Sequence, residues 1–272
     1  MNVLLLMLAA AATSGVGALA GVGGAVLLVP ILVVSGMPVA VAAPLGLVSV
    51  AALSIAAAPT HLDYRVVNHR LGLITEVAAT GGAVIGAVVS DVVPNRVLVY
   101  VLAAAALAAA MVGGRRKGRR NVPDPSLGPS DVGERVSSLS GAYPLGDKVV
   151  PYEVRRVRAG LGFMALAGLI AGTAGVSGGF IKTPATSELM HVPTMVAAAT
   201  TTFTIGITAA SALCVFAVQG RIDTRAASAV IVGAVVGSML GVRLQARLVP
   251  STVRAGLSVL LVIVAVVMVV SA

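Results

Sequence analysis

One pattern, two adjacent glycines followed by two prolines, occurs twice in this chain and constrains its fold more than any other feature. The copies are Gly23-Gly24 with Pro30 and Pro38, and Gly178-Gly179 with Pro184 and Pro193. They lie 155 positions apart, and both stand in strongly apolar sequence. Two homologous halves, each with a glycine break inside an apolar segment, are typical of secondary transporters, whose halves enclose one binding site.

The composition places the chain in a membrane. Its 272 residues are 58% hydrophobic and 11% charged, which excludes an ordinary soluble domain. Apolar stretches cover about 3–34, 38–60, 71–93, 97–114, 159–187, 194–218, 226–242 and 251–272. Most of them reach the roughly 20 residues that a membrane-spanning helix needs. Because a helix satisfies its own backbone in lipid, we expect an all-α polytopic membrane protein with about seven or eight membrane segments.

The charged residues divide the chain into three parts. We predict a first membrane repeat over 1–112, a linker over 113–158 and a second membrane repeat over 159–272. The linker carries ten of the 19 Lys and Arg residues, with Pro, Gly and Ser between them, which predicts a flexible segment. Basic loops mark the cytoplasmic side. We therefore expect a multi-pass protein of the cell (plasma or inner) membrane with a cytoplasmic linker, and we interpret the basic run as a topology determinant, not a nucleic-acid site.

The first apolar segment is too long for a single straight crossing. As one helix, residues 3–34 would measure about 48 Å, against a hydrocarbon core of about 30 Å. The segment either unwinds at Gly21–Gly24 and crosses, which makes the repeats parallel, or turns back there as a re-entrant hairpin, which makes them inverted. Arg221 and Arg225 favour the parallel arrangement, whereas the basic residues between 243 and 254 favour the inverted one. Both remain open, and inverted repeats would produce a symmetric site at the midplane.

The glycine breaks are candidate anion-binding elements. Glycine weakens a helix and permits positive φ, and a helix that resumes after a break presents free N–H groups with a partial positive charge. Such termini bind anions. We predict a substrate site where the two breaks meet, formed by Gly23, Gly24, Ser177, Gly178 and Gly179. In the alternative reading, these glycines only permit close helix packing, as the Gly82xxxGly86, Gly168xxxGly172 and Gly233xxxGly237xxxGly241 spacings are predicted to do.

Both halves resemble the TauE/SafE family of membrane anion transporters, also called the sulfite exporter family. Gly21–Pro30 with Pro38 and Gly175–Pro184 with Pro193 match the family's glycine-rich break and paired prolines. The first half departs from that pattern at Ala25, where a third glycine is common. The resemblance covers nearly the whole chain outside the linker. It implies movement of small sulfur-containing or organic anions such as sulfite, sulfonates or sulfoacetate.

Lys182 is the main charged candidate, because a lysine inside an apolar element is costly unless it faces protein or water. We predict that it binds the anion together with Thr183 and Thr204, and that Glu188 neutralises it in the empty state. A lysine that extends to the interface is the alternative. Thr200, Thr204 and Thr208 share one helical face and either line a polar path or bond back to their own helix.

Two carboxylates are candidates for coupling or gating, Glu188 and Glu76. Glu76 is a candidate proton carrier if it lies deeper than the interface, although its position five residues after Leu71 favours an interfacial location. For a bare anion no coupling ion is needed for export, since a potential that is negative inside contributes about 2.3 kcal/mol per charge per 100 mV.

The leading interpretation is therefore a secondary transporter that exports a small anion. The alternatives are a proton-coupled anion uptake permease and a membrane scaffold without transport. Gly175–Gly178 fits the GxSG of rhomboid-type proteases, but no apolar segment holds a well-buried His as base, so we expect no enzyme. We expect no cofactor, no metal and no nucleic acid. The expected partners are the small anion and the lipid bilayer, with a homodimer left open.

Overall fold

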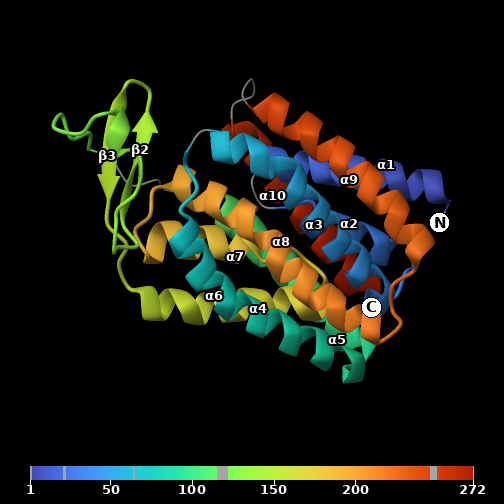
Figure 1. The fold of residues 1–272 in the computed structure, drawn as a ribbon. Coiled ribbons are helices and arrows are strands. Elements are labelled where there is room, and N and C mark those ends of the chain that lie inside the picture. The colour runs from blue at the N-terminus through green and yellow to red at the C-terminus, as the bar shows by residue number, and fades with distance from the viewer. Residues whose placement is uncertain (1, 21–22, 64, 115–121, 246–249, 272) are drawn as a thin grey trace.

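The computed structural model describes residues 2–20, 23–63, 65–114, 122–245 and 250–271. It is a bundle of helices that cross at different tilts, with a small β-sheet beyond one end (Figure 1). The first half contributes α1 (Val3–Ala20), α2 (Ala25–Val34), α3 (Val39–Asp63), α4 (His69–Val92) and α5 (Asn95–Gly114). The second half contributes α6 (Val157–Ala174), α7 (Gly179–Pro184), the π-helical turn η2 (Ala185–Leu189), α8 (Thr194–Val218), α9 (Thr224–Gln245) and α10 (Pro250–Ser271).

The described helices fit a multi-pass membrane protein. Five of them, α3, α4, α6, α8 and α9, are long and apolar enough to cross a bilayer, and shorter apolar stretches occur in α1, α2, α5 and α10. Large apolar side chains point outward from the bundle, for example Ile55 at 74% exposure and Val77 at 76%. Such a surface is suited to lipid, because an apolar side chain that faces hydrocarbon carries no free-energy penalty.

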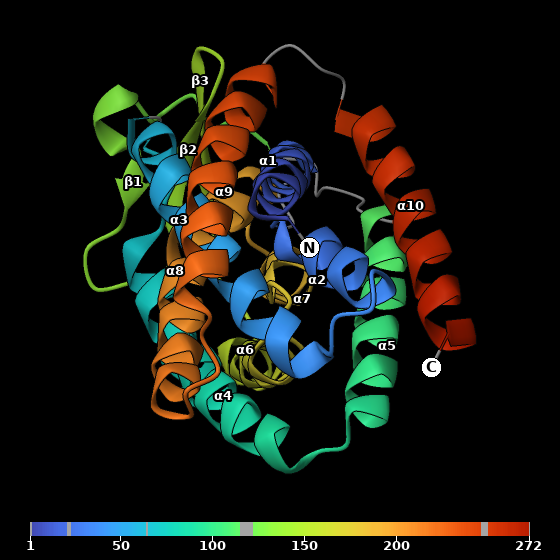
Figure 2. The ribbon, with the colours of Figure 1, turned by 90° about the vertical axis from the view of Figure 1, so that its right-hand side faces the viewer.

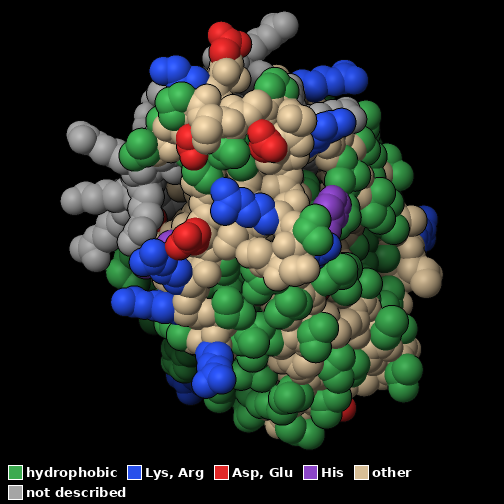
Figure 3. Space-filling model, turned by 60° about the vertical axis from the view of Figure 1, so that its left-hand side comes forward, with side chains coloured by type: hydrophobic (Ala, Val, Ile, Leu, Met, Phe, Trp, Pro, Cys, Tyr) green, Lys and Arg blue, Asp and Glu red, His purple; other side chains and the backbone are tan. Residues whose placement is uncertain are grey.

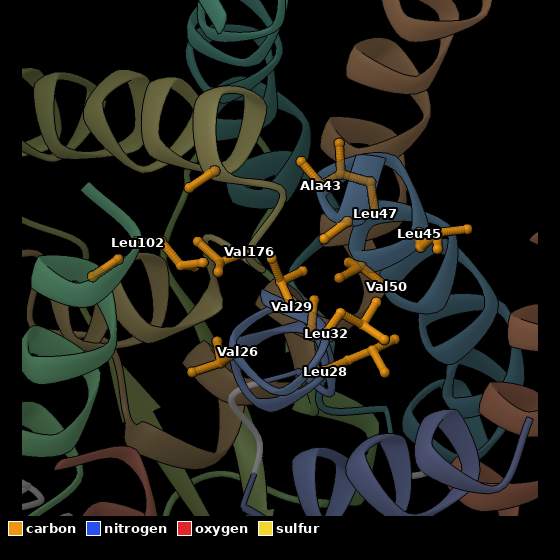
Figure 4. Close-up of a cluster of buried hydrophobic side chains, with 14 of the residues drawn as sticks. Val26, Leu28, Val29, Leu32, Ala43, Leu45, Leu47, Val50, Leu102 and Val176 are labelled. Carbon is orange, nitrogen blue, oxygen red and sulfur yellow. The ribbon is translucent and has the colours of Figure 1, made fainter. Parts of the chain in front are cut away.

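The short helix α2 lies inside the bundle. Seven of its ten residues are buried, and it is hydrophobic on all sides, as expected of a helix with no face toward solvent. Figure 4 shows Val26, Leu28, Val29 and Leu32 of α2 surrounded by side chains of α3, by Leu102 of α5 and by Val176 of the second break. The view along the bundle in Figure 2 shows α1 and α6 nearly end-on, with α2 and α7 in the interior.

Two pairs of parallel helices are held together by small residues. A Cβ atom added to Gly82 or Gly86 of α4 would lie 2.1 Å from Ala165 O or 2.3 Å from Leu169 O of α6. Added to Gly237 of α9, it would lie 2.0 Å from Ala11 O of α1. Only glycine permits such a close backbone approach. The close packing predicted from the glycine spacings is therefore confirmed at these positions.

The chain reverses direction at each glycine break. Gly24 lies against Ser14 of α1, and Gly178 lies against Ala167 of α6, so both short helices turn back toward the helix that precedes them. Gly23 and Gly175 have φ of +85° and +70°, values that glycine adopts without strain. Gly21 and Val22 lie outside the described residues. α1 begins at the end of the bundle away from the sheet, whereas α6 begins beside the sheet (Figure 1).

The linker contains a folded sheet, so the all-α prediction is wrong for this part of the chain. The 3₁₀ turn η1 (Pro129–Asp131) precedes the antiparallel strands β1 (Gly133–Glu134), β2 (Gly141–Leu145) and β3 (Lys148–Tyr152), in spatial order β1-β2-β3. Leu145 pairs with Lys148 across the two-residue turn Gly146-Asp147, and Gly146 has φ +61°. Glycine at this position favours a tight hairpin. The basic cluster at 115–120 lies outside the described residues.

The sheet is docked onto the ends of α4, α6 and α8. Asn68, the N-cap of α4, donates from Nδ2 to Tyr152 Oη at 2.9 Å and to Leu139 O at 2.8 Å. The backbone N–H of Arg155 donates to Met190 O at 3.0 Å. Tyr143, Val150 and Tyr152 share an apolar cluster with membrane-helix residues such as Leu71, Met164 and Met190. Burial raises the pKa of Tyr152 to about 12, so this phenol stays neutral at physiological pH.

Candidate functional site

A buried ion pair joins the two halves of the chain. Lys182 of α7 places Nζ 2.8 Å from Oε2 of Glu76 in α4, and the two side chains are only 3% and 4% exposed. Glu76 lies seven residues after the start of α4, which is about 10 Å along the helix. A buried charge is tolerated when it is paired and hydrogen-bonded, and removal of one partner is strongly destabilising.

Thr208 of α8 completes this arrangement. The Lys182 ammonium donates to Thr208 Oγ1 at 2.5 Å, and the backbone N–H of Thr208 donates to Glu76 Oε1 at 2.9 Å. The Thr208 hydroxyl also donates to Glu76 Oε1. The Glu76 carboxylate thus accepts hydrogen bonds from an ammonium, a hydroxyl and an amide. These are donors that bind a carboxylate or another oxyanion strongly.

The two glycine breaks meet inside the bundle. A Cβ atom added to Gly23 would lie 2.4 Å from Ser177 Oγ, and both residues are buried. Gly24, Gly178 and Gly179 are buried as well. The carbonyl of Gly178 accepts hydrogen bonds from the N–H groups of Ile181 and Lys182, which begins the short helix that carries the lysine.

Buried hydroxyl groups surround the lysine-bearing segment. Thr183 Oγ1 and Ser187 Oγ have no hydrogen-bond partner within the part of the chain that the structure describes, and the same holds for Ser14 Oγ beside Gly24. Buried polar groups are normally paired, so these unpaired hydroxyls on the lysine-bearing segment and beside the first break are candidates for contact with a ligand. Thr183 follows Lys182 directly on α7 and is buried, and its predicted contact with an anion stays a prediction.

The comparison with known protein families identifies the family of the chain. The profile of the sulfite exporter TauE/SafE family matches residues 6–268. The chain belongs to the TauE/SafE family. No curated protein and no solved structure shows a significant match to it. The family is that of membrane transporters of the sulfite exporter type.

The predicted partner of Lys182 in this TauE/SafE protein was wrong. Glu188 is exposed, whereas Glu76 makes the ion pair. Glu188 lies in the π-helical turn η2, and its side chain is exposed whereas that of Lys182 is buried, so the two side chains leave on different faces. Glu76 is buried inside the bundle, although its closeness to the loop favoured an interfacial location. The i,i+3 and i,i+4 spacings visible in a sequence cannot reveal a pair 106 positions apart.

The helix after the second break is short. α7 has six residues and passes directly into the π-helical turn η2. A helix this short has a weak dipole, because few aligned peptide units contribute to it. The full charge of Lys182 is therefore the main source of positive potential on this side of the breaks.

A row of buried threonines extends from the ion pair toward the sheet. Thr200, Thr204 and Thr208 are all less than 5% exposed, and Gly72 of α4 lies against the methyl groups of Thr204 and Thr200. Thr200 Oγ1 accepts a hydrogen bond of 2.9 Å from the backbone N–H of Asn68. The predicted common face of these threonines is confirmed, and it connects the ion pair to the residue that holds the sheet.

The ends of α4 and α8 that lie away from the sheet are also held together. Arg221 donates to Ala40 O at 2.9 Å and to Ser90 Oγ at 2.8 Å, and its guanidinium lies 4.4 Å above the Phe216 ring. These contacts join the first turn of α3 to the last turns of α4 and α8. With the hydrogen bond from Asn68 to Thr200 at the sheet end, the α4–α8 interface is held at both ends. Among the described residues, no cluster of His, Cys, Asp or Glu fits a metal ion.

Proposed function

We propose that this TauE/SafE protein is a secondary transporter of small sulfur-containing or organic anions, such as sulfite, sulfonates or sulfoacetate. The observation that supports this function most is the buried Lys182 ammonium, held against a carboxylate by donors from α8. Sulfite, sulfonate and carboxylate groups present similar oxygen atoms to a donor, so groups that hold the Glu76 carboxylate are suited to a substrate oxyanion. Export is the direction that the family description names.

The proposed binding site comprises Lys182 and the polar groups around it. The anion would take the ammonium as its principal partner and complete the hydrogen bonds of Thr183 and Ser187, whose hydroxyls have none among the described residues. The further candidates remain those at the meeting point of the breaks and on α8, namely Gly23, Gly24, Ser177, Gly178, Gly179 and Thr204. Polar contacts of this kind replace the hydration that an anion loses inside a membrane protein.

We also propose that residues 1–112 and 159–272 are inverted repeats. Two observations support this: α1 and α6 start at opposite ends of the bundle, and each turns back at its glycine break (Figure 1). The parallel contacts α4–α6 and α1–α9 are equivalent under exchange of the halves. Inverted repeats commonly enclose the substrate site of a secondary transporter near the midplane.

The distribution of charge supports a cytoplasmic linker in the cell membrane. The described basic residues at the sheet end are Arg65, Arg70, Arg135, Lys148, Arg155, Arg156, Arg158 and Arg243, whereas those at the opposite end are Arg96, Arg221 and Arg225. Figure 3 shows charged side chains gathered around the sheet and a largely hydrophobic surface over the helices. An excess of Lys and Arg favours the cytoplasmic side.

Cysteine labelling tests this orientation. In a Cys214→Ala background, single cysteines at Ser126 and Ser138 of the linker should resist an impermeant maleimide added to intact cells and react after permeabilisation. A cysteine at Asp223, an exposed residue at the opposite end, should react in intact cells. Labelling of Ser126→Cys from outside, with Asp223→Cys protected, would reverse the proposed orientation.

A thermal-shift panel tests the substrate class. Purified protein should be stabilised by at least one of sulfite, methanesulfonate, sulfoacetate and simple carboxylates, and chloride salts of matched ionic strength serve as the reference. A ligand present at 100 times its Kd adds about 2.7 kcal/mol to the free energy of unfolding. If no anion of the panel raises Tm, the proposed substrate class is wrong.

A further inference from the structure

The Glu76 carboxylate occupies the donors that a substrate anion would need. Lys182 Nζ lies 2.8 Å from Glu76 Oε2, and the Thr208 N–H lies 2.9 Å from Glu76 Oε1. An arriving anion that takes Lys182 as its partner must displace this carboxylate. We propose that Glu76 takes up one proton when the anion binds, so that the protein co-transports one proton with each monovalent anion. This inference rests on the proposed anion transport and names its second substrate.

Burial makes the proton necessary. Glu76 is 3% exposed, and Ala79, three residues further along α4, is fully buried as well. A carboxylate that loses its ammonium partner in such surroundings faces a desolvation penalty of several kcal/mol. Protonation removes the charge, and the neutral carboxyl group still accepts a hydrogen bond from the Thr208 N–H. The site then holds an ammonium next to the anion and a neutral acid beside them.

The described charges near Glu76 leave Lys182 as its counter-ion. On α4 itself, His69 and Arg70 lie at the exposed start and Asp91 at the exposed end. On α6 the charged residue is Arg158, in the exposed first turn, and α8 carries no charged residue. Glu188 of η2 is exposed. Within the described part of the chain, Lys182 is the ionic partner of Glu76. If an anion takes Lys182 from Glu76, no other described charge can compensate the carboxylate.

The positions related to this site by the repeat carry no equivalent pair. The 155-residue offset relates Glu76 to Ile231, Lys182 to Leu27 and Thr208 to Leu53, all of which are apolar. The repeat therefore does not duplicate the site. With one such site per chain among these related positions, we expect one proton for one anion.

Charge balance fixes the electrical behaviour. The empty site holds a carboxylate and an ammonium and is neutral. The loaded site holds a carboxylic acid, an ammonium and a monovalent anion and is also neutral. Each transport step therefore moves no net charge. The membrane potential would drive a bare anion outward, but it does not act on this electroneutral step. The direction follows the combined gradients of proton and anion.

The test uses wild-type protein in proteoliposomes with methanesulfonate, which remains monovalent across the accessible pH range, so that any proton must be carried by the protein. An inward proton gradient of about one pH unit should accumulate methanesulfonate about tenfold. A potassium diffusion potential of about 100 mV should leave its distribution unchanged, whereas it would shift a bare monovalent anion about 50-fold. Uptake that follows the potential and ignores the pH gradient would overturn the inference and leave the proposed transport intact. The lack of any uptake would count against the proposed function itself.

A Glu76→Gln variant provides the second measurement. It should still take up methanesulfonate, now without a proton, so uptake should become sensitive to the potential and insensitive to the pH gradient. Glu153→Gln, which changes an exposed linker carboxylate, is the matched control and should behave as wild type. Electroneutral, pH-driven uptake by Glu76→Gln would overturn the assignment of the proton to Glu76. If this variant does not fold, the wild-type measurement alone decides.

Discussion

Replacement of Lys182 by methionine should destabilise the folded protein by about 3–5 kcal/mol and abolish anion binding. The instability arises because the variant leaves Glu76 buried at 3% exposure without its ammonium partner, so that it must stay charged or take up a proton, and breaking a buried ion pair costs this much. Binding is lost because the principal positive charge of the site is gone. Unfolding in detergent micelles, followed by helical circular dichroism against denaturant, measures the first effect, and the thermal-shift panel measures the second.

The double variant Lys182→Met/Glu76→Gln separates stability from binding. Removal of both charges together is often neutral, so the double variant should recover most of the lost stability and still fail to bind the anion. Lys148→Met, at an exposed position on β3, should change stability by less than about 0.5 kcal/mol. A Lys182→Met protein as stable as wild type would show that the pair observed here does not form in the membrane.

Substitution of Gly82 by alanine should destabilise the protein by about 3 kcal/mol, the upper end of the range for overpacking. The new Cβ atom would lie 2.1 Å from the backbone oxygen of Ala165, which cannot move aside as a flexible side chain would. α4 would have to separate from α6, and because Glu76 lies six residues before Gly82 on α4, the Lys182 pair would be disturbed as well. Anion binding should weaken along with stability.

The neighbouring glycine provides a matched control. Gly81 lies on the same helix, and a Cβ atom added there would meet nothing within 4 Å. Gly81→Ala should therefore stabilise the helix slightly, by about 0.5–1 kcal/mol, because alanine is the better helix former. Thermal unfolding of the two variants side by side measures the difference. Equal Tm changes for Gly81→Ala and Gly82→Ala would contradict the parallel α4–α6 contact.

The sequence predicted the parts of the fold that depend on local composition. Apolar stretches predict membrane helices because the free energy of transfer into lipid is set by each segment separately. Glycine spacing predicts close packing because the glycines that permit it lie on one face of one helix. The contact of Gly23 with Ser177 followed from the duplication of the breaks. Lys182 was identified because a charge inside an apolar segment is conspicuous.

The partner of Lys182 and the linker sheet were missed for physical reasons. Glu76 meets Lys182 only through the packing of α4, α7 and α8, and no spacing along the chain reports a contact of that kind. The linker was predicted to be flexible because it is rich in charged residues, Pro, Gly and Ser. The sequence did contain a hairpin signal, Gly146-Asp147 between short apolar runs. Glu188, close in sequence to Lys182, was chosen for its proximity, and helical geometry turns it to another face.

The central claim is that a small oxyanion crosses the membrane through the site at Lys182, and uptake of radiolabelled sulfite by proteoliposomes tests it most directly. Wild-type protein should give saturable uptake that unlabelled sulfite suppresses, whereas the folded double variant Lys182→Met/Glu76→Gln should give only the background of empty liposomes. Sulfite uptake by the double variant at the wild-type rate would contradict the account.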